Sequence, residues 1–229
     1  MIPLRDNLPT RRLPIVTLLL IGVNGYAFLR AFLLGPWAGQ RFISYYGLIP
    51  CGLTGHCEIV GRAFSPEVTL FTSMFVHAGL FHLAGNMLYL WIFGNNVEDV
   101  MGKVRFAIFY LLCGVGSAWI QILVNPASRI PMVGASGAIS GVLGAYLVLF
   151  PHARILTLVP LGLLFPILEI RAVYVIGFWV IVQVLNGLLT FSYDGGGVAW
   201  FAHIGGFAVG LALVPFFRRG SLSRGWRRY

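Results

Sequence analysis

Long apolar runs separated by short polar segments fill most of the chain. A helix that spans a membrane needs about 20 predominantly apolar residues. Six runs are apolar enough to predict spanning helices, at residues 14–34, 80–93, 104–124, 134–150, 171–190 and 198–217. The fourth run is short, and the second continues into a more polar segment that contains Glu98 and Asp99. The pattern therefore predicts an all-α polytopic membrane protein with six transmembrane helices.

Two other stretches do not follow this pattern. Residues 35–79 mix apolar, aromatic, charged and proline residues. They are too polar to span and too apolar for a solvated loop, so we expect them to lie in the membrane interface. Residues 151–171 contain an apolar segment interrupted by Pro160 and Pro166. Since proline breaks the interior of a helix, we expect a membrane-associated connection there and no seventh span.

The composition supports a protein surrounded by membrane lipid. Of the 229 residues, 58% are hydrophobic and 10% are charged, which is more apolar surface than a soluble domain of this size can bury. The net charge of +9 would suit nucleic acid, but the arginines lie beside the apolar runs, where they orient membrane helices. We therefore expect no nucleic-acid partner. The first run is long and lacks a small-residue cleavage site, which favours a retained helix over a signal peptide.

The basic residues also predict the orientation. Six spans place both termini on one side of the membrane. All of the 16 lysines and arginines fall on that side except Arg30, Arg41, Arg62 and Arg129. Because positive residues accumulate in the cytoplasm, both termini are expected there. We divide the chain into a cytoplasmic basic N-terminus (1–13), a six-helix membrane domain (14–217) and a basic cytoplasmic tail (218–229).

The three cysteines carry little chemistry. Cys113 lies in the middle of a predicted helix and is expected to serve packing. Cys51 and Cys57 lie in one loop, where a disulfide can form if that loop faces an oxidising side. His56 is next to Cys57, but the spacing matches no zinc motif, and we expect no metal site.

A candidate nucleophile lies where a polar loop meets the fourth apolar run. Ser136 is flanked there by Gly134, Ala135 and Gly137. A serine at such a junction has an exposed hydroxyl with backbone N–H groups close by, as a serine nucleophile requires. The alternative is structural, because serine and glycine are common wherever membrane helices pack closely.

Other polar residues are expected at the same depth. The second, fourth and sixth predicted helices run in the same direction, and each carries its polar residues near its start: His77, His82 and Asn86, then Ser136, then His203. His82 and Asn86 can simply bond each other, and His203 can be a satisfied core residue. Ionisable residues inside a membrane are nevertheless costly and mark function by default.

Glycine spacing predicts that two of these helices touch. Gly137 and Gly141 lie four residues apart on the fourth helix, and Gly206 and Gly210 repeat that spacing on the sixth. Small residues at this spacing let two helices approach closely, which would bring Ser136 to His203. Tight packing without chemistry is the alternative.

An ordered set of motifs carries a resemblance to a known family. The motifs are His77-x4-His82-x3-Asn86, Phe93-Gly94-Asn95-Asn96-Val97-Glu98-Asp99, Gly134-Ala135-Ser136-Gly137, Trp179-x3-Gln183, and His203-Ile204-Gly205-Gly206 with Gly210. Over nearly the whole chain they resemble the rhomboid family of intramembrane serine proteases. The opening segment, residues 2–6, is similar to prokaryotic members. Many members carry a Trp-Arg pair in the first loop, and here residues 68–72 depart from it.

The resemblance implies a rhomboid-like bundle and a role for each motif residue. Ser136 would be the nucleophile and His203 its general base and acid. The Ser136 N–H, the His82 ring and the Asn86 amide would hold the oxyanion, with His77 supporting the loop. No carboxylate is expected at this depth, because Asp194 belongs to the loop before the sixth helix, so we expect a Ser–His dyad without a third member and without a cofactor.

The same resemblance implies partners and a location. Substrates would be single-pass transmembrane or membrane-anchored proteins that enter sideways past the fifth helix, and the location would be a prokaryotic plasma (inner) membrane. One alternative is a non-proteolytic member of the same scaffold, a binder or chaperone of membrane proteins, but such members lack the serine or the histidine. A small transporter is another, but it predicts an inverted repeat that this chain does not show.

Overall fold

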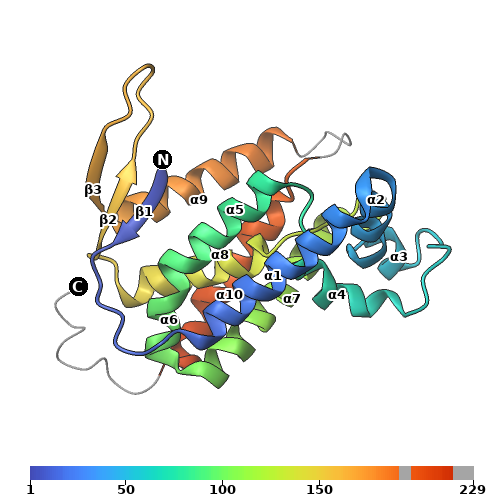
Figure 1. Ribbon diagram of the computed structural model, residues 1–229, viewed down its shortest axis with the longest axis horizontal. Coiled ribbons are helices and arrows are strands. Elements are labelled where there is room, and N and C mark those ends of the chain that lie inside the picture. Colours follow the sequence, from blue (N-terminus) through green and yellow to red (C-terminus); the bar gives the residue numbers. More distant parts are fainter. Residues whose placement is uncertain (191–196, 219–229) are drawn as a thin grey trace.

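The computed structural model describes residues 1–190 and 197–218, and these form a mostly helical bundle with a small sheet at one end (Figure 1). Among the described residues, four helices are long and apolar enough to cross a membrane: α1 (Ile15–Leu33), α7 (Lys103–Val124), α9 (Ala172–Leu189) and α10 (Trp200–Phe217). A bent pair, Pro66–Phe75 with Leu80–Met101, raises the count to five, and α8 (Ser136–Leu149) is a shorter apolar helix. The polytopic helical class is confirmed, and six spans remain a prediction.

The second predicted helix is longer than its apolar run. It begins as α5 (Leu80–Tyr89), passes through a π-helical turn at Leu90–Gly94 and ends as α6 (Asn95–Met101). The polar extension is tolerated because it is used structurally. The carboxylate of Glu98 accepts hydrogen bonds from the Val16 and Thr17 N–H groups, at 3.0 and 2.8 Å, and from the Thr17 hydroxyl. A carboxylate at a helix N-terminus satisfies unpaired N–H groups and the helix dipole, so Glu98 caps α1.

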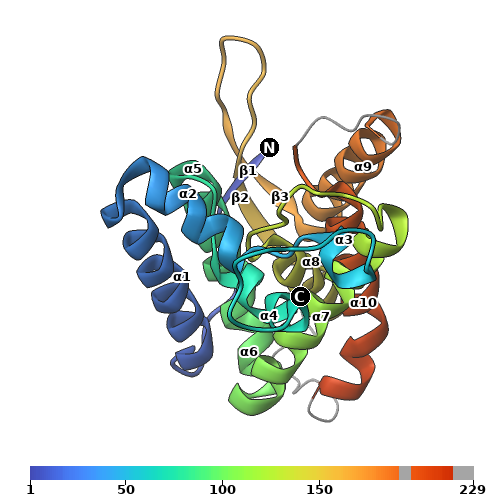
Figure 2. The same cartoon turned by 90° about the vertical axis from the view of Figure 1, so that its right-hand side faces the viewer.

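Helix α8 lies in the centre of the bundle, as the end-on view shows (Figure 2). It is short and apolar on all sides because its neighbours, α7 and α10 above all, cover almost every residue. A side chain at Gly206 would collide with the carbonyl of Gly137, and one at Gly210 with the backbone of Gly141. The predicted glycine contact between the fourth and sixth helices is therefore confirmed.

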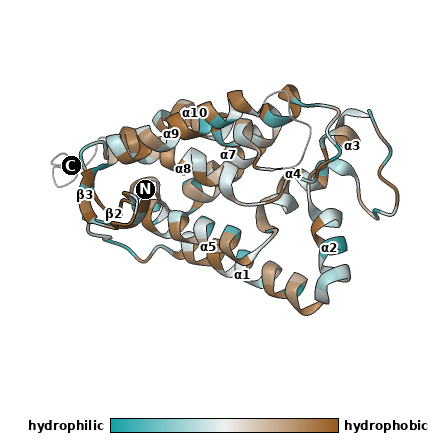
Figure 3. Ribbon diagram, turned by 90° about the horizontal axis from the view of Figure 1, so that it is seen from above, coloured by the Kyte–Doolittle hydropathy of each residue, from teal (hydrophilic) through white to brown (hydrophobic). Residues whose placement is uncertain are grey.

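The outward-facing sides of the outer helices are apolar, whereas those of a water-soluble protein are polar. Figure 3 shows brown, hydrophobic residues along α9 and α10. On α9 the large side chains Tyr174, Ile181 and Leu188 are all more than half exposed. Such a surface suits lipid and not water, which agrees with the predicted membrane class.

Residues 151–171 form structure that the hydrophobic pattern did not predict. Strands β2 (Arg154–Leu158) and β3 (Ile167–Arg171) make an antiparallel hairpin, and β1 (Ile2–Asp6) pairs with the other edge of β2. Pro160 and Pro166 lie in the turn region between β2 and β3, where no ladder N–H is required of them. The prolines thus do exclude a spanning helix, but they delimit a hairpin. We call the end of the bundle with this sheet the sheet end; it is on the left in Figure 1.

Residues 35–79 fold into short helices at the opposite end, where α2 (Gly35–Tyr46), α3 (Pro50–Thr54) and α4 (Thr69–Thr72) lie. A disulfide joins Cys51 to Cys57, which answers the question that the sequence left open. The Arg62 guanidinium donates to the Ser44 and Gly47 carbonyls at 2.8 and 2.7 Å. Arg62 therefore ties this segment together in a chain that lacks the Trp-Arg pair.

Two predicted segments lie outside the described residues. They are the polar part of the loop before α10, with Ser192, Asp194, Gly195 and Gly196, and the basic tail from residue 219 onward.

Candidate active site

Ser136 is the first residue of α8, so the loop-to-helix junction lies where the sequence predicts it. The turn that leads into it needs glycine at 134, whose φ of +117° is unfavourable for other residues and whose missing side chain leaves room for the His82 ring. The Gly134 N–H donates to the Ser73 carbonyl at 2.9 Å, and the Ala135 N–H donates to His77 Nε2 at 3.4 Å. His77 therefore contacts the backbone next to Ser136, as the supporting role expected for it requires.

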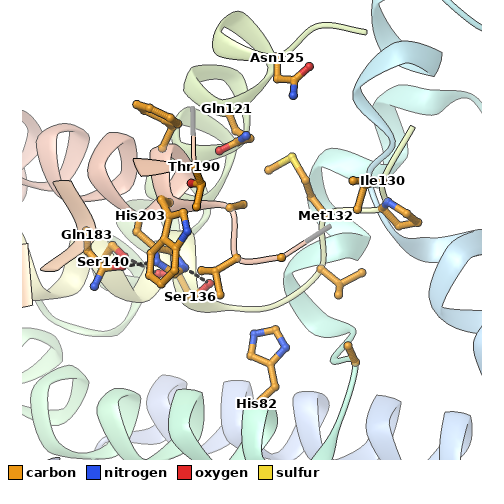
Figure 4. Close-up of a pocket in the computed structure, with 18 of the residues that line it drawn as sticks. His82, Gln121, Asn125, Ile130, Met132, Ser136, Ser140, Gln183, Thr190 and His203 are labelled. Carbon is orange, nitrogen blue, oxygen red and sulfur yellow. Dashed lines mark hydrogen bonds between the residues drawn. The ribbon is translucent and has the colours of Figure 1, made fainter. Parts of the chain in front are cut away.

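His203 lies in the first turn of α10 and meets Ser136 across the glycine contact. Its Nε2 atom is 2.7 Å from Ser136 Oγ, which is hydrogen-bonding distance (Figure 4). Two side chains of helix α7 bond the backbone of Ala202, the residue before His203. The Ser117 hydroxyl donates to the Ala202 carbonyl at 2.7 Å, and the Ala202 N–H donates to Gln121 Oε1 at 3.1 Å. Side chains of a third helix thus fix the start of α10 where the histidine meets the serine.

The far side of the imidazole has a partner that the sequence analysis did not assign to the site. His203 Nδ1 is 2.8 Å from Oε1 of Gln183 on α9. Gln183 is only 5% exposed. The spacing Trp179-x3-Gln183 was the available signal, because it places both residues on one face of a helix. The indole rings of Trp179 and Trp200 lie beside the imidazole, with ring centroids 6.1 and 6.2 Å away.

His82 and Asn86 lie one turn apart on α5 and face the same loop from the other side of the site. The His82 ring packs edge-on against the His77 ring, with centroids 5.1 Å apart. One N–H of the Asn86 amide donates to the His82 carbonyl at 3.0 Å. A side chain added at Gly134, two residues before the serine, would collide with the His82 ring and lie 3.7 Å from the Asn86 amide nitrogen. The structure therefore brings Ser136 and His203 into direct contact, and Figure 4 shows His82 across from them. Asn86, one turn further along α5, lines the same cavity.

A single cavity of about 1190 Å³ joins all four residues. Its wall also includes polar groups of the loop at residues 125–131, among them Asn125 and Ser128. A serine at a helix N-terminus adds two features to this space: the N–H groups of the first turn have no partner within the helix, and the helix dipole is positive there. An oxyanion formed next to Ser136 would be stabilised by both.

Within residues 1–190 and 197–218, no group of three or more His, Cys, Asp or Glu side chains is arranged to hold a metal ion. The geometry instead has the components of acyl transfer, namely a hydroxyl, an imidazole in contact with it and hydrogen-bond donors nearby.

The sequence that forms this site matches a known protein family. Residues 66–220 match the model of the Rhomboid domain. The chain belongs to the rhomboid family. Rhomboids are in general intramembrane serine proteases.

Named relatives support the same assignment. Rhomboid protein 1, mitochondrial, of Saccharomyces cerevisiae is 35% identical over 145 residues, which cover 61% of this chain and 38% of the yeast protein. RHOMBOID-like protein 1 of Arabidopsis thaliana is 34% identical over 192 residues, or 82% of this chain and 45% of the plant protein. The human presenilin-associated rhomboid-like protein, mitochondrial, is 38% identical over 85 residues, or 36% of this chain and 22% of the human protein. This rhomboid thus spans less than half the length of each of these relatives.

These relatives correct the predicted location. A prokaryotic plasma membrane was expected from the opening residues 2–6, but the yeast and human relatives are named as mitochondrial proteins. The expected location is therefore wrong. The reason is that the expectation rested on five residues, and the charge and hydropathy of the remaining chain do not distinguish membranes of different compartments.

Proposed function

We propose that this rhomboid is an intramembrane serine endopeptidase that cleaves single-pass transmembrane or membrane-anchored proteins with a Ser136–His203 pair. The observation that carries the proposal is the 2.7 Å contact between Ser136 Oγ and His203 Nε2 in a cavity. An apolar helix bundle has no structural need for a serine and a histidine held together beside open space.

The chemistry follows from this contact. His203 Nε2 takes the Ser136 proton while Oγ bonds to the scissile carbonyl carbon, and the carbonyl oxygen becomes an oxyanion. When the C–N bond breaks, the imidazolium returns its proton to the leaving amine, which leaves an acyl-enzyme on Ser136. A water molecule then loses a proton to His203 while its oxygen bonds to the acyl carbon. The bond from that carbon to Oγ breaks, and the imidazolium returns the proton to Oγ, which releases the carboxylic acid and restores the serine.

The oxyanion would be held from two directions. The Ser136 N–H approaches from the start of α8, and the His82 ring and Asn86 amide approach from α5. Each such donor typically contributes about 3–4 kcal/mol to transition-state stabilisation. The loop at residues 125–131 supplies polar groups at the cavity wall, where water for the second step can enter.

The position of the cavity suggests where a substrate is cut. A peptide carbonyl in a regular helix is already hydrogen-bonded, so the substrate must unwind, which costs several kcal/mol for each polar group left unpaired in lipid. The polar cavity can satisfy those groups, but only near the membrane face opposite the sheet end. We therefore expect cleavage close to that face, next to Gly or Pro, with α9 as the element that admits the substrate and a small residue before the scissile bond.

A fluorophosphonate probe tests the activity without knowledge of the substrate. We expect the purified protein to be labelled at Ser136, and Ser136→Ala to remain unlabelled. Absence of labelling in the folded wild-type protein would contradict an activated serine and would favour a binding role for the scaffold.

A transmembrane reporter tests the substrate model. Changing the Gly and Pro residues near the cleaved end of its membrane segment to Leu should slow cleavage, because Leu stabilises the helix that must unwind. Equal cleavage of the parent and the stiffened reporter, or a cut near the sheet end, would contradict this model.

A further inference from the structure

The proposed mechanism requires one tautomer of His203, and the structure shows what can select it. A neutral imidazole carries one proton, on Nδ1 or on Nε2. Only the form protonated on Nδ1 leaves a lone pair on Nε2 to take the serine proton. We propose that Gln183 is a positioning residue that holds His203 in this form; the inference rests on the proposed function.

The orientation of the Gln183 amide follows from its two contacts. One contact is the carbonyl of Trp179, 3.2 Å away, and a carbonyl can only accept. The NH₂ group must therefore point to Trp179. The other end of the amide, Oε1, then lies 2.8 Å from His203 Nδ1. Turning the amide over would set its oxygen against the Trp179 carbonyl, so the orientation is fixed by the backbone of α9.

The protonation of the imidazole follows in turn. Oε1 is an acceptor without a proton, so Nδ1 must be the donor in the 2.8 Å contact. Nε2 then carries the lone pair and accepts from the Ser136 hydroxyl at 2.7 Å. The chain of contacts thus runs in one direction, from Ser136 through His203 to Gln183 (Figure 4) and on to the Trp179 carbonyl.

The hydrogen bond between His203 and Gln183 also becomes stronger when the proton is transferred from Ser136. When His203 takes the serine proton, its Nδ1–H belongs to a cation, and a hydrogen bond from a charged donor is roughly twice as strong as a neutral one. Water is a poor substitute because Gln183 is only 5% exposed. An amide also suits this depth better than a carboxylate, since it accepts the same hydrogen bond without burying a second charge. The dyad expected from the sequence therefore has an uncharged third member.

Substitution of Gln183 gives a kinetic test. Gln183→Leu removes the acceptor and should lower kcat by about 10- to 100-fold, with KM and Tm close to the wild-type values, because the lost bond is strongest in the transition state. Gln183→Glu keeps an oxygen acceptor at the same reach and should restore part of kcat, with the rest lost because a carboxylate buries a second charge. Asn186→Leu is the matched control, because the Asn186 amide also donates to a carbonyl four residues earlier on α9, that of Val182 at 2.7 Å. It should leave kcat unchanged.

Nitrogen NMR of the protein labelled with ¹⁵N-histidine gives a test that needs no substrate. The His203 signals, assigned by their loss in His203→Ala, should show a proton on Nδ1 in the wild type and a shift toward the other tautomer in Gln183→Leu. A proton on Nε2 in the wild type would overturn the inference. So would a Gln183→Leu variant with kcat within twofold of the wild type, or one whose kcat falls only in step with Tm and is not rescued by Glu.

The two tests separate this inference from the proposed function. If the wild-type protein neither reacts with the probe nor cleaves a reporter, the proposed function fails, while the tautomer measurement still decides the role of Gln183. If labelling and cleavage depend on Ser136 but the tautomer is indifferent to Gln183, only the inference fails.

Discussion

The two ends of the bundle both bury polar groups, but they use them differently. At the sheet end, Glu98 accepts three hydrogen bonds from the start of α1, and Asp6 accepts from the Tyr146 hydroxyl and the Asn96 amide, both at 2.7 Å. At the other end, which we call the site end, Ser136 and His203 bond each other beside a cavity. Polar groups whose hydrogen bonds are all made within the protein stabilise a fold, whereas groups left next to open space can react.

Substitutions at the two ends should have different consequences. A change at the site end removes chemistry while the packing remains, because the reactive groups are few and face a cavity. A change at the sheet end leaves a buried group without its partner, which lowers stability and leaves the chemistry of the folded molecules intact. The contact between α8 and α10 joins the two ends and should affect both properties.

The largest effect is expected at the site end itself. Ser136→Ala and His203→Ala should each reduce cleavage of a transmembrane reporter by at least about 10³-fold, because the two residues act as a unit. The double variant should be no worse than either single one. The Tm of all three should stay close to that of the wild type. Appreciable cleavage by either purified single variant would contradict the catalytic pair.

The next effect concerns the contact that joins the ends. Gly206→Leu should lower both Tm and activity, because a side chain there collides with the Gly137 carbonyl and separates α10 from α8. Overpacking of this kind typically costs about 1–3 kcal/mol. Gly177→Leu is the control, since nothing lies within 4 Å of its added side chain. An unchanged Tm and full activity in Gly206→Leu would show that the contact is not close.

A smaller effect is expected at the sheet end. Glu98→Gln keeps the shape of the side chain but loses the charge that caps α1 and one of its acceptor oxygens. We expect the free energy of unfolding to fall by about 1–3 kcal/mol. Fluorophosphonate labelling per folded molecule should stay at the wild-type level. A loss of labelling without a loss of stability would show that Glu98 affects the reactivity of Ser136, which contradicts separate roles for the two ends.

An effect of comparable size is a pH dependence at the same end. Burial raises the pKa of the Asp6 carboxyl from its ordinary value of 3.8 to about 6, although the Tyr146 hydroxyl opposes the rise. The folded protein thus holds this proton more tightly than the unfolded chain, so Asp6 contributes stability below about pH 4 that is lost as the pH rises through about 6. Asp6→Asn resembles the protonated acid. Its Tm should match the wild type at low pH and exceed it above pH 7, and a difference independent of pH would contradict this account.

Much of this architecture follows from local sequence. Apolar runs predict α7 at 104–124 and α9 at 171–190, and the structure has them at Lys103–Val124 and Ala172–Leu189. The start of α8 at Ser136 and the glycine contact with α10 were also predictable, because helix boundaries and small-residue spacing are written in consecutive residues.

The tertiary structure decided the rest. Strand β1 pairs with β2, although about 150 residues separate them in the sequence. Neither Ile2–Asp6 nor Arg154–Leu158 contains a pattern that identifies the other as its partner. The Gln183 contact depends on how α9 is rotated against α10, which a helical period does not determine when most positions of a membrane helix are apolar. Local pattern fixes which segments are helices because backbone hydrogen bonds in a helix are local, whereas partners between segments are set by packing that only the folded chain provides.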